Sequence, residues 1–169
     1  MRALADRAEA YEVVLVASNK PEAPGLKWAS ERGLDTWAVD SKGMSKEAFD
    51  RALSAELEHR GVGTIALAGF MRILSPWFVE EWRGRILNIH PSLLPKFRGL
   101  DTHARAIAAG DAVSGCSVHV VTEELDAGEV LGQAEVRIGT DDTPERLEKR
   151  VLAAEHQLYP KVLSEFVRR

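Results

Sequence analysis

Three apolar runs, separated by segments with helical patterning, constrain most strongly what this 169-residue chain can fold into. They lie within YEVVLVASN (11–19), GTIALAG (63–69) and RILNI (85–89). Successive residues in each run are apolar, which is typical of strands that are covered on both faces. Strands of this kind alternating with helices predict an α/β domain whose mostly parallel sheet is covered by helices on both faces.

The remaining segments fit this architecture. Residues 61–66 match a dinucleotide-binding pattern by letter, but they lead into a strand and not into a helix, so we interpret them as a turn. The strands expected at 115–123 and 129–138 are joined by the short connection ELDAG, which predicts a more antiparallel end of the sheet. A short strand is expected at 34–40, and helices are expected at 2–9, 21–31, 75–82 and 103–109, from Ser45 through Leu57, and from Thr143 onward.

The composition indicates one soluble domain, because 45% of the residues are hydrophobic, 28% are charged and no linker-like stretch divides the chain. The net charge of -4 does not favour nucleic acid. The single Cys116 excludes an intramolecular disulfide, and the histidines lack the paired spacing of a metal site. No apolar run is long enough to span a membrane, and residues 1–6 lack the pattern of a signal peptide, so a cytoplasmic protein is expected.

The segment NIHPSLLP brings together two residues that suit chemistry. Asn88 and His90 are two positions apart on a predicted strand, so they project from the same face. Pro91 ends that strand, and ligands bind beyond the carboxyl ends of strands in open parallel sheets. An amide can donate to an oxyanion, and an imidazole can move a proton near neutral pH. The alternative is that Asn88 caps the turn while His90 packs under the loop.

Asp126 lies in the ELDAG connection, where Asp and Gly are common for turn geometry alone. If this connection folds back over the end of the sheet, its carboxylate can orient His90 or hold a water that relays a proton. Spacing leaves both interpretations open.

Three motifs in order along the chain, AGFMRILSP (68–76), LNIHPSLLPKFRG (87–99) and SVHVVTEELDAG (117–128), resemble the phosphoribosylglycinamide (glycinamide ribonucleotide) formyltransferases, and AEHQLYP (154–160) fits the same family. HPSLLP alone specifies only the folate-dependent formyltransferase superfamily, whereas its combination with SVHxVTxELDxG is more specific. The resemblance covers essentially the whole chain. It implies the formyltransferase fold, a Rossmann-like three-layer sandwich with a mostly parallel twisted sheet.

The resemblance implies transfer of the formyl group of 10-formyltetrahydrofolate to the amine of glycinamide ribonucleotide in purine biosynthesis, without a metal. By motif match, Asn88, His90 and Asp126 form the catalytic trio. Asn88 and protonated His90 would stabilise the tetrahedral oxyanion, and Asp126 would hold the imidazolium and a proton-relaying water. Asn88 is also expected to contact the nucleotide substrate.

The same resemblance implies the ligand contacts. Main-chain groups around MRIL and the ELDAG loop would hold the folate, and Glu155 would contact the ribose of the nucleotide. Without the resemblance, Arg72 is a surface cation, Leu74 a core residue and Glu155 a solvated helix acid. His119 is expected to be a hydrogen-bonded structural histidine near the site, and a cis Leu94–Pro95 bond is suggested. The residues expected at the folate are Arg72, Ile73, Leu74, Val121, Glu123, Glu124 and Asp126.

We expect residues 1–169 to form a single formyltransferase domain, which departs from the family at its amino-terminal end. Family members begin with an apolar strand and a Gly-Ser-rich loop that holds the substrate phosphate at a helix N-terminus. Neither is present here, and the strand should be central, so its absence would expose paired backbone edges. Three alternatives explain this departure: the sequence starts at an internal Met, the sequence is a fragment, or the protein is a folate-binding fold that has lost substrate binding. The chain as given is expected to be weakly stable and poor at binding the nucleotide.

Other functions remain as alternatives. A 10-formyltetrahydrofolate hydrolase is the nearest enzyme, and a catalytically silent folate-binding module is the nearest non-enzyme. A formyltransferase acting on initiator tRNA is disfavoured by the acidic balance. Monomer and homodimer are both compatible with the sequence.

Overall fold

The computed structural model describes residues 1–169 as an α/β assembly of six helices and six strands. The short N-terminal helix α1 (Arg2–Asp6) leads to the first strand–helix–strand unit. The helices that follow are α2 (Pro24–Ser30), α3 (Lys46–His59), α4 (Pro76–Glu81), α5 (Thr102–Ala108) and α6 (Pro144–Phe166). The strands are β1 (Val16–Ser18), β2 (Thr36–Ala38), β3 (Ile65–Leu67), β4 (Ile86–His90), β5 (Val113–Val120) and β6 (Val130–Arg137).

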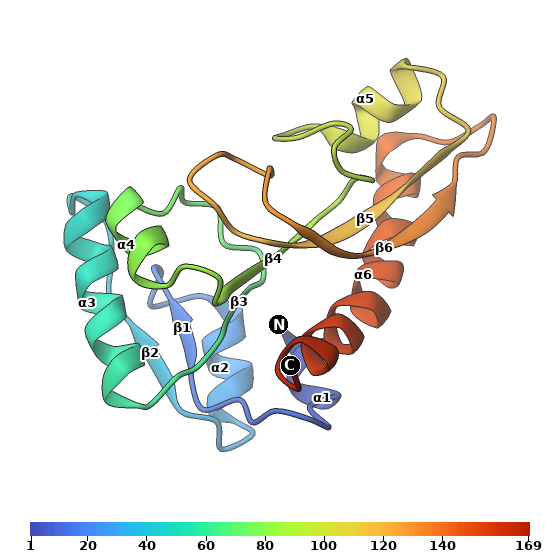
Figure 1. Cartoon of the computed structure of the whole chain (residues 1–169). Helices are drawn as coiled ribbons and strands as arrows, with labels where there is room; N and C mark the ends of the chain where they lie inside the picture. The colour runs from blue at the N-terminus through green and yellow to red at the C-terminus, as the bar shows by residue number, and fades with distance from the viewer.

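The strands form two separate sheets. β1 pairs with β2 in parallel, and a second sheet has the order β3-β4-β5-β6. In that second sheet β3 and β4 are parallel, whereas β4–β5 and β5–β6 are antiparallel. β1 and β3 are not hydrogen-bonded to each other, although they lie near the middle of the molecule (Figure 1). The α/β class and the antiparallel end are as predicted.

Capping residues and prolines mark the residues at which helices begin. Ser45, Ser75 and Thr143 each cap a helix by accepting a backbone N–H from the residue three positions on. Pro76 and Pro144 occupy the first helical position, where the missing N–H has no intrahelical partner to lose. The helices expected from these signals are confirmed.

The predictions for β1 and β3, the two strands that are not hydrogen-bonded to each other, were wrong in extent and burial. The run 11–19 contains only three strand residues, and Val14 is 37% exposed. β3 is likewise three residues long and only partly buried. Each of these strands has a partner on one edge alone, so its ladder is short and its side chains are incompletely covered. Helix α1 also ends three residues earlier than expected.

The core has two main parts on opposite faces of β3 and β4. One lies under α3 and α4 and contains Phe49, Phe78 and Trp82. The other lies under α6 and contains Leu87, Val118 and Tyr159, whose hydroxyl donates to the Leu87 carbonyl at 2.8 Å. Strand β4 is therefore held firmly from both faces. It carries Asn88 and His90 at its carboxyl end.

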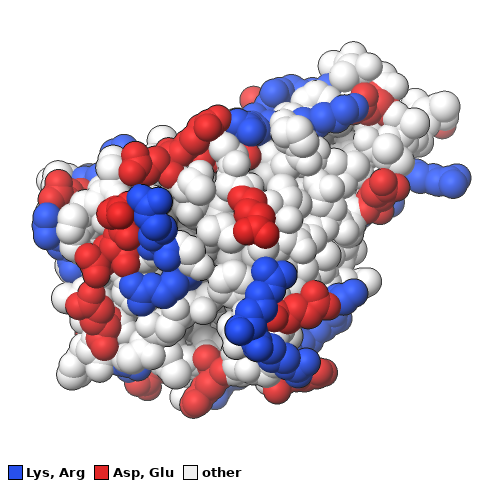
Figure 2. Space-filling model, in the orientation of Figure 1, with Lys and Arg blue, Asp and Glu red and all other residues white.

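The surface carries both signs of charge. Lys and Arg side chains alternate with Asp and Glu over the face seen in Figure 2, with no extended field of one sign. No helix is long and apolar enough to cross a membrane.

Candidate active site

Strand β4 places Asn88 and His90 opposite β5, with Asn88 beside His119 and His90 beside Ser117. The strand ends at His90, and the loop that begins with Pro91 turns over the end of the sheet. His90 is buried and Asn88 is partly buried. The expected placement at a strand end is confirmed, while the catalytic roles stay predictions.

His90 has an acceptor at each ring nitrogen. Its Nε2 lies 3.0 Å from the Phe97 carbonyl oxygen, and its Nδ1 lies 3.4 Å from Asp126 Oδ2. A carbonyl oxygen only accepts, so Nε2 carries a proton in this arrangement. A second proton on Nδ1 would then meet the carboxylate directly. Nε2 must therefore leave the Phe97 carbonyl before it can donate to a ligand.

His119 fixes the amide of Asn88. The His119 Nδ1 donates to the Val120 carbonyl oxygen at 3.0 Å, which leaves Nε2 as the acceptor of the neutral ring. Asn88 Nδ2 lies 3.3 Å from that Nε2. Burial lowers the pKa of His119, so the neutral ring persists near neutral pH. One Asn88 N–H is thereby anchored, and the second N–H is free for a ligand.

Asp126 lies close to both histidines, but it makes no hydrogen bond to His119 Nε2, which is itself an acceptor in the neutral ring. Its Oδ1 lies 3.5 Å from His119 Nε2, and its Oδ2 accepts the backbone N–H of Gly99 at 2.9 Å in addition to facing His90. The residue is 9% exposed and has a positive φ of 50°. Asp126 therefore occupies a turn, and its carboxylate also reaches back over the sheet end to His90, while its role in proton transfer stays a prediction. The structure brings Asn88, His90 and Asp126 into one cluster beside His119.

A hydrogen-bonded frame holds the loop that covers this cluster. Ser117 Oγ donates to the Ser92 carbonyl at 2.6 Å and accepts the Leu94 N–H at 3.0 Å. Gln133 Nε2 donates to the Leu94 carbonyl at 2.9 Å, and the Leu94–Pro95 bond is cis. These contacts tie the loop to both β5 and β6. The position of Phe97 above His90 is thus set by long-range contacts.

The residues expected at the folate lie on two segments beside the cluster. Ile73 is 64% exposed while Leu74 is buried in the α3–α4 core, and the Arg72 guanidinium lies 5.2 Å from the centre of the Phe49 ring. The Val121 N–H donates to the Ile86 carbonyl at 2.8 Å, which attaches the ELDAG connection to β4. Glu124 of this connection and the preceding Glu123 are both exposed, and Glu124 pairs with Arg98 at 2.6 Å.

Glu155 lies apart from the trio, with no hydrogen bond or ion pair joining it to Asn88, His90 or Asp126. It is half-buried on α6, which departs from the solvated helix acid of the alternative, while its contact with the ribose stays a prediction. Burial, with a smaller contribution from Glu148, raises the pKa of Glu155 to about 7, and the positive amino terminus of Met1 opposes this rise. The folded Glu155 therefore keeps its proton at pH values where an ordinary glutamate is ionised.

The raised pKa of Glu155 predicts a specific pH dependence of stability. The folded carboxyl holds a proton between pH of about 4.5 and 7 where the unfolded one is ionised, so its contribution to the free energy of unfolding falls as pH rises through this window. Glu155→Gln should therefore be more stable than the parent at pH 8, by about 1–2 kcal/mol after allowance for partial solvent exposure, and no more stable at pH 4.5. Thermal unfolding at both pH values measures this. Glu165→Gln, at an exposed position of the same helix, is the control, and a loss of stability at pH 8 would contradict the prediction.

His103 is a residue near the cluster to which the sequence assigned no role. Its Nδ1 is buried without a hydrogen-bond partner, and burial lowers its pKa, with Glu148 raising it and His90 lowering it. A histidine on the polar first turn of a short helix gives no distinguishing sequence signal. Cys116 is fully buried, and burial raises the pKa of its thiol to about 12, so the expected packing role is confirmed.

This fold and this site define a class of protein. Residues 1–163 match the model of the formyl transferase family. The chain belongs to the formyl transferase family.

Individual relatives carry more specific names than the family. The chain is 47% identical over 152 residues to the phosphoribosylglycinamide formyltransferase of Escherichia coli, which covers 89% of this chain and 72% of the relative. It is 48% identical to the trifunctional purine biosynthetic protein adenosine-3 of Gallus gallus over 90% of this chain, but spans only 15% of that protein. The crystal structure of phosphoribosylglycinamide formyltransferase from Brucella melitensis superposes with a TM-score of 0.91 at 48% identity, covering 98% of this chain and 88% of the other.

Proposed function

We propose that this protein transfers the formyl group of 10-formyltetrahydrofolate to the amine of glycinamide ribonucleotide, a step of purine biosynthesis. The observation that carries the proposal is the cluster of Asn88, His90 and Asp126 at the carboxyl end of β4, built from two separate segments. Relatives named phosphoribosylglycinamide formyltransferase match about nine-tenths of the chain. Both substrates are small molecules, and we propose a cytoplasmic monomer or homodimer.

The reaction needs charge stabilisation and proton transfer. The substrate amine forms a bond to the formyl carbon, and the carbonyl oxygen becomes a tetrahedral oxyanion. The free N–H of Asn88 and an N–H of protonated His90 donate to that oxygen, in a site where fixed donors are most effective. The proton lost by the attacking nitrogen is passed to the folate nitrogen as its bond to carbon breaks. The amide product and tetrahydrofolate result.

Asp126 supports this chemistry in two ways. Its carboxylate faces His90 Nδ1, so it stabilises the imidazolium, and it can hold a water between the attacking and leaving nitrogens. The Gly99 N–H donates to the Oδ2 atom that also faces His90, and so holds the carboxylate in place. His119 acts on Asn88 by anchoring one of its N–H groups, and is a positioning residue.

The ligands are assigned to opposite sides of the cluster. We place the folate across the backbone of Arg72, Ile73 and Leu74 and against Val121, Glu123, Glu124 and Asp126. The exposed apolar side chains of Met71 and Ile73 beside this backbone support a flat aromatic ligand there. The nucleotide is placed against Asn88 and Glu155.

We further propose that residues 1–169 belong to one formyltransferase domain, which the family match over residues 1–163 supports.

A single assay separates this function from its rivals. The protein is mixed with 10-formyltetrahydrofolate in the presence and absence of glycinamide ribonucleotide, and release of tetrahydrofolate is followed. We expect folate product only when the amine is present. Turnover without the amine indicates a hydrolase, and folate binding without turnover under either condition indicates a binding module.

A further inference from the structure

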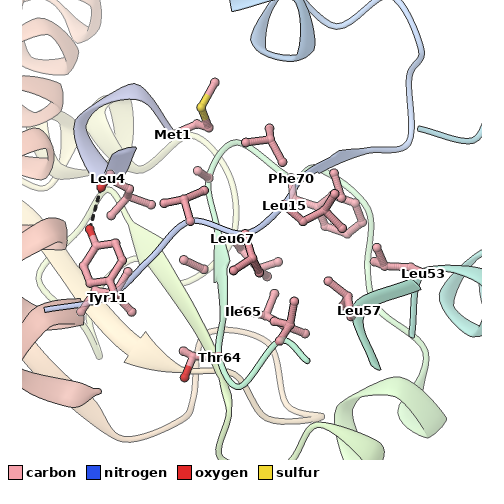
Figure 3. Close-up of a pocket in the computed structure, with 18 of the residues that line it drawn as sticks. Met1, Leu4, Tyr11, Leu15, Leu53, Leu57, Thr64, Ile65, Leu67 and Phe70 are labelled. Carbon is pink, nitrogen blue, oxygen red and sulfur yellow. Dashed lines mark hydrogen bonds between the residues drawn. The ribbon is translucent and has the colours of Figure 1, made fainter. Parts of the chain in front are cut away.

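The largest cavity of the molecule does not border the catalytic cluster. It has a volume of about 610 Å³ and lies between β1 and β3, and Figure 3 shows Ile65 and Leu67 of β3 among its lining residues. Neither His90 nor Asp126 lines it. Each of these two side chains instead has a hydrogen-bond partner in residues 97–101, which we call the covering segment and which leads from the loop after β4 into α5.

The covering segment contacts both proposed catalytic groups through its backbone. The Phe97 carbonyl oxygen lies 3.0 Å from His90 Nε2, and the Gly99 N–H donates to Asp126 Oδ2 at 2.9 Å. The same Oδ2 atom faces His90 Nδ1 at 3.4 Å. A displacement of the covering segment would therefore change the orientation of the imidazole and of the carboxylate together.

The conformation of the covering segment is not one that its residues adopt on local preference. Phe97 and Asp101 have positive φ values of 54° and 56°, in the left-handed region that residues other than glycine rarely occupy. Residues in this region persist only where the surrounding structure holds them. The covering segment therefore needs contacts from other parts of the chain to keep its place over His90 and Asp126.

Arg105 of α5 supplies such contacts. Its Nη1 donates to the Arg98 carbonyl oxygen at 2.6 Å and to the Leu100 carbonyl oxygen at 3.1 Å. Its guanidinium carbon lies 5.4 Å from the centre of the Phe97 ring. A guanidinium is always charged and presents its donors in a rigid plane, so it can hold two carbonyls and a ring face at once. Arg105 thus contacts the covering segment on both sides of Gly99.

Helix α5 gives this guanidinium a fixed base. Ala106, the next residue, has no exposed surface, and Ile107 packs against the core cluster under α6. The Arg105 N–H donates to the Asp101 carbonyl at 3.0 Å, which joins the helix to the end of the covering segment. Arg105 itself is exposed, so the core does not depend on its side chain.

A second charged contact of the covering segment is weaker. Arg98 pairs with Glu124 at 2.6 Å, but the two side chains are 40% and 74% exposed. An ion pair between side chains in water contributes little, and both side chains can move while the backbone stays in place. Arg105 differs because its partners are main-chain carbonyls, so its donors act on the backbone directly.

The direction of the effect on catalysis follows from the strengths of the acceptors. A charged acceptor forms the stronger hydrogen bond, so His90 Nε2 exchanges the neutral Phe97 carbonyl for the oxyanion as charge develops. Until then the carbonyl keeps the imidazole oriented toward Asp126. Release of the covering segment therefore lowers the rate of formyl transfer and does not raise it.

We propose that Arg105 is a positioning residue for formyl transfer, which holds the covering segment so that the Phe97 carbonyl orients His90 and the Gly99 N–H orients Asp126. The kinetic part of this inference rests on the proposed function. Because Arg105 acts through the backbone of the covering segment, its effect falls on kcat and not on the binding of either substrate.

Two variants separate hydrogen-bond donation from packing. Arg105→Met removes the donors and keeps an unbranched side chain against Phe97, whereas Arg105→Lys keeps a charged donor. We expect Arg105→Met to lower kcat by about tenfold, with KM for both substrates within about twofold of the parent, because a small misplacement of catalytic groups is costly. Arg105→Lys should keep kcat within about threefold of the parent, since an ammonium can donate to the same carbonyls.

Arg85→Met is the matched control for these variants. The Arg85 guanidinium also donates to a backbone carbonyl, that of Glu81 at 2.7 Å, and lies 4.3 Å from the centre of the Trp82 ring. It is exposed like Arg105, but it precedes β4 and so lies at the opposite end of that strand from His90. Arg85→Met should retain parental kcat.

Hydrogen exchange tests the position of the covering segment without turnover. The Gly99 amide should exchange about tenfold faster in Arg105→Met than in the parent, because local opening breaks its bond to Asp126. The Leu94 amide, which Ser117 holds in the same loop, should exchange at the parental rate. Tm should change by less than about 2 °C, since the substituted side chain is exposed.

The opposite results would overturn the inference. Parental exchange at Gly99 in Arg105→Met would show that the covering segment keeps its place without Arg105. Faster exchange at Gly99 with parental kcat would show that the covering segment does not position the catalytic groups, and equal losses of kcat in Arg105→Met and Arg105→Lys would show that donation is not the cause. Absence of formyl transfer in the parent would overturn the proposed function, and exchange at Gly99 would still decide whether Arg105 holds the covering segment.

Discussion

Replacing Asn88 with alanine is expected to lower kcat for formyl transfer by about 10²–10³-fold, because it removes a fixed donor to the tetrahedral oxyanion. His90→Ala is expected to lower kcat by about 10²–10⁴-fold, since it removes both a donor and the proton-transfer group. Steady-state release of tetrahydrofolate at saturating folate measures these effects. KM for the folate should change little, because the assigned folate contacts lie on other segments.

The control for these variants is His59→Ala, a histidine on the exposed side of α3, which should retain parental kcat. The double variant Asn88→Ala/His90→Ala should lose less activity than the product of the single losses, because both side chains act on one oxyanion. Parental turnover in Asn88→Ala, with the fold intact by circular dichroism, would contradict the assigned role.

The second large effect concerns Gly128, which ends the ELDAG connection. A Cβ added there would lie 1.8 Å from the Val120 carbonyl oxygen and 3.2 Å from the Thr122 methyl group. The carbonyl belongs to the backbone at the end of β5, so one chain must shift, at a cost of about 2–4 kcal/mol. Gly128→Ala should therefore lower Tm by about 5–15 °C. It should also lower kcat, because the shift moves Asp126 relative to His90.

Gly139→Ala is the matched control for Gly128→Ala. A Cβ at Gly139 meets nothing closer than 3.6 Å, which is ordinary contact, so Tm should stay within about 2 °C of the parent. Equal losses of stability in the two variants would show that close approach to Val120 is not the cause.

Most elements of this fold follow from local signals in the sequence. Ser45, Ser75 and Thr143 fix helix starts, because a capping side chain acts within three residues of its own position. The apolar run around Ile86 specifies a buried strand, because β4 has partners on both edges and helices on both faces. The similar run at 11–19 did not give a long strand, because strand length depends on a neighbour and one edge of β1 has none.

The candidate site, too, could be predicted from the sequence only in part. The residue types and the two-residue spacing of Asn88 and His90 indicate a shared face at a strand end, and the family motifs name Asp126 as their partner. Only the tertiary structure placed Asp126 3.4 Å from His90, engaged His90 Nε2 with the Phe97 carbonyl, and set Asn88 against His119. These contacts join β4, β5 and two loops that are distant in sequence. They depend on sheet register and loop path, which no local pattern encodes. Caps, turns and apolar runs, in contrast, act through neighbouring residues, and they can therefore be predicted from the sequence itself.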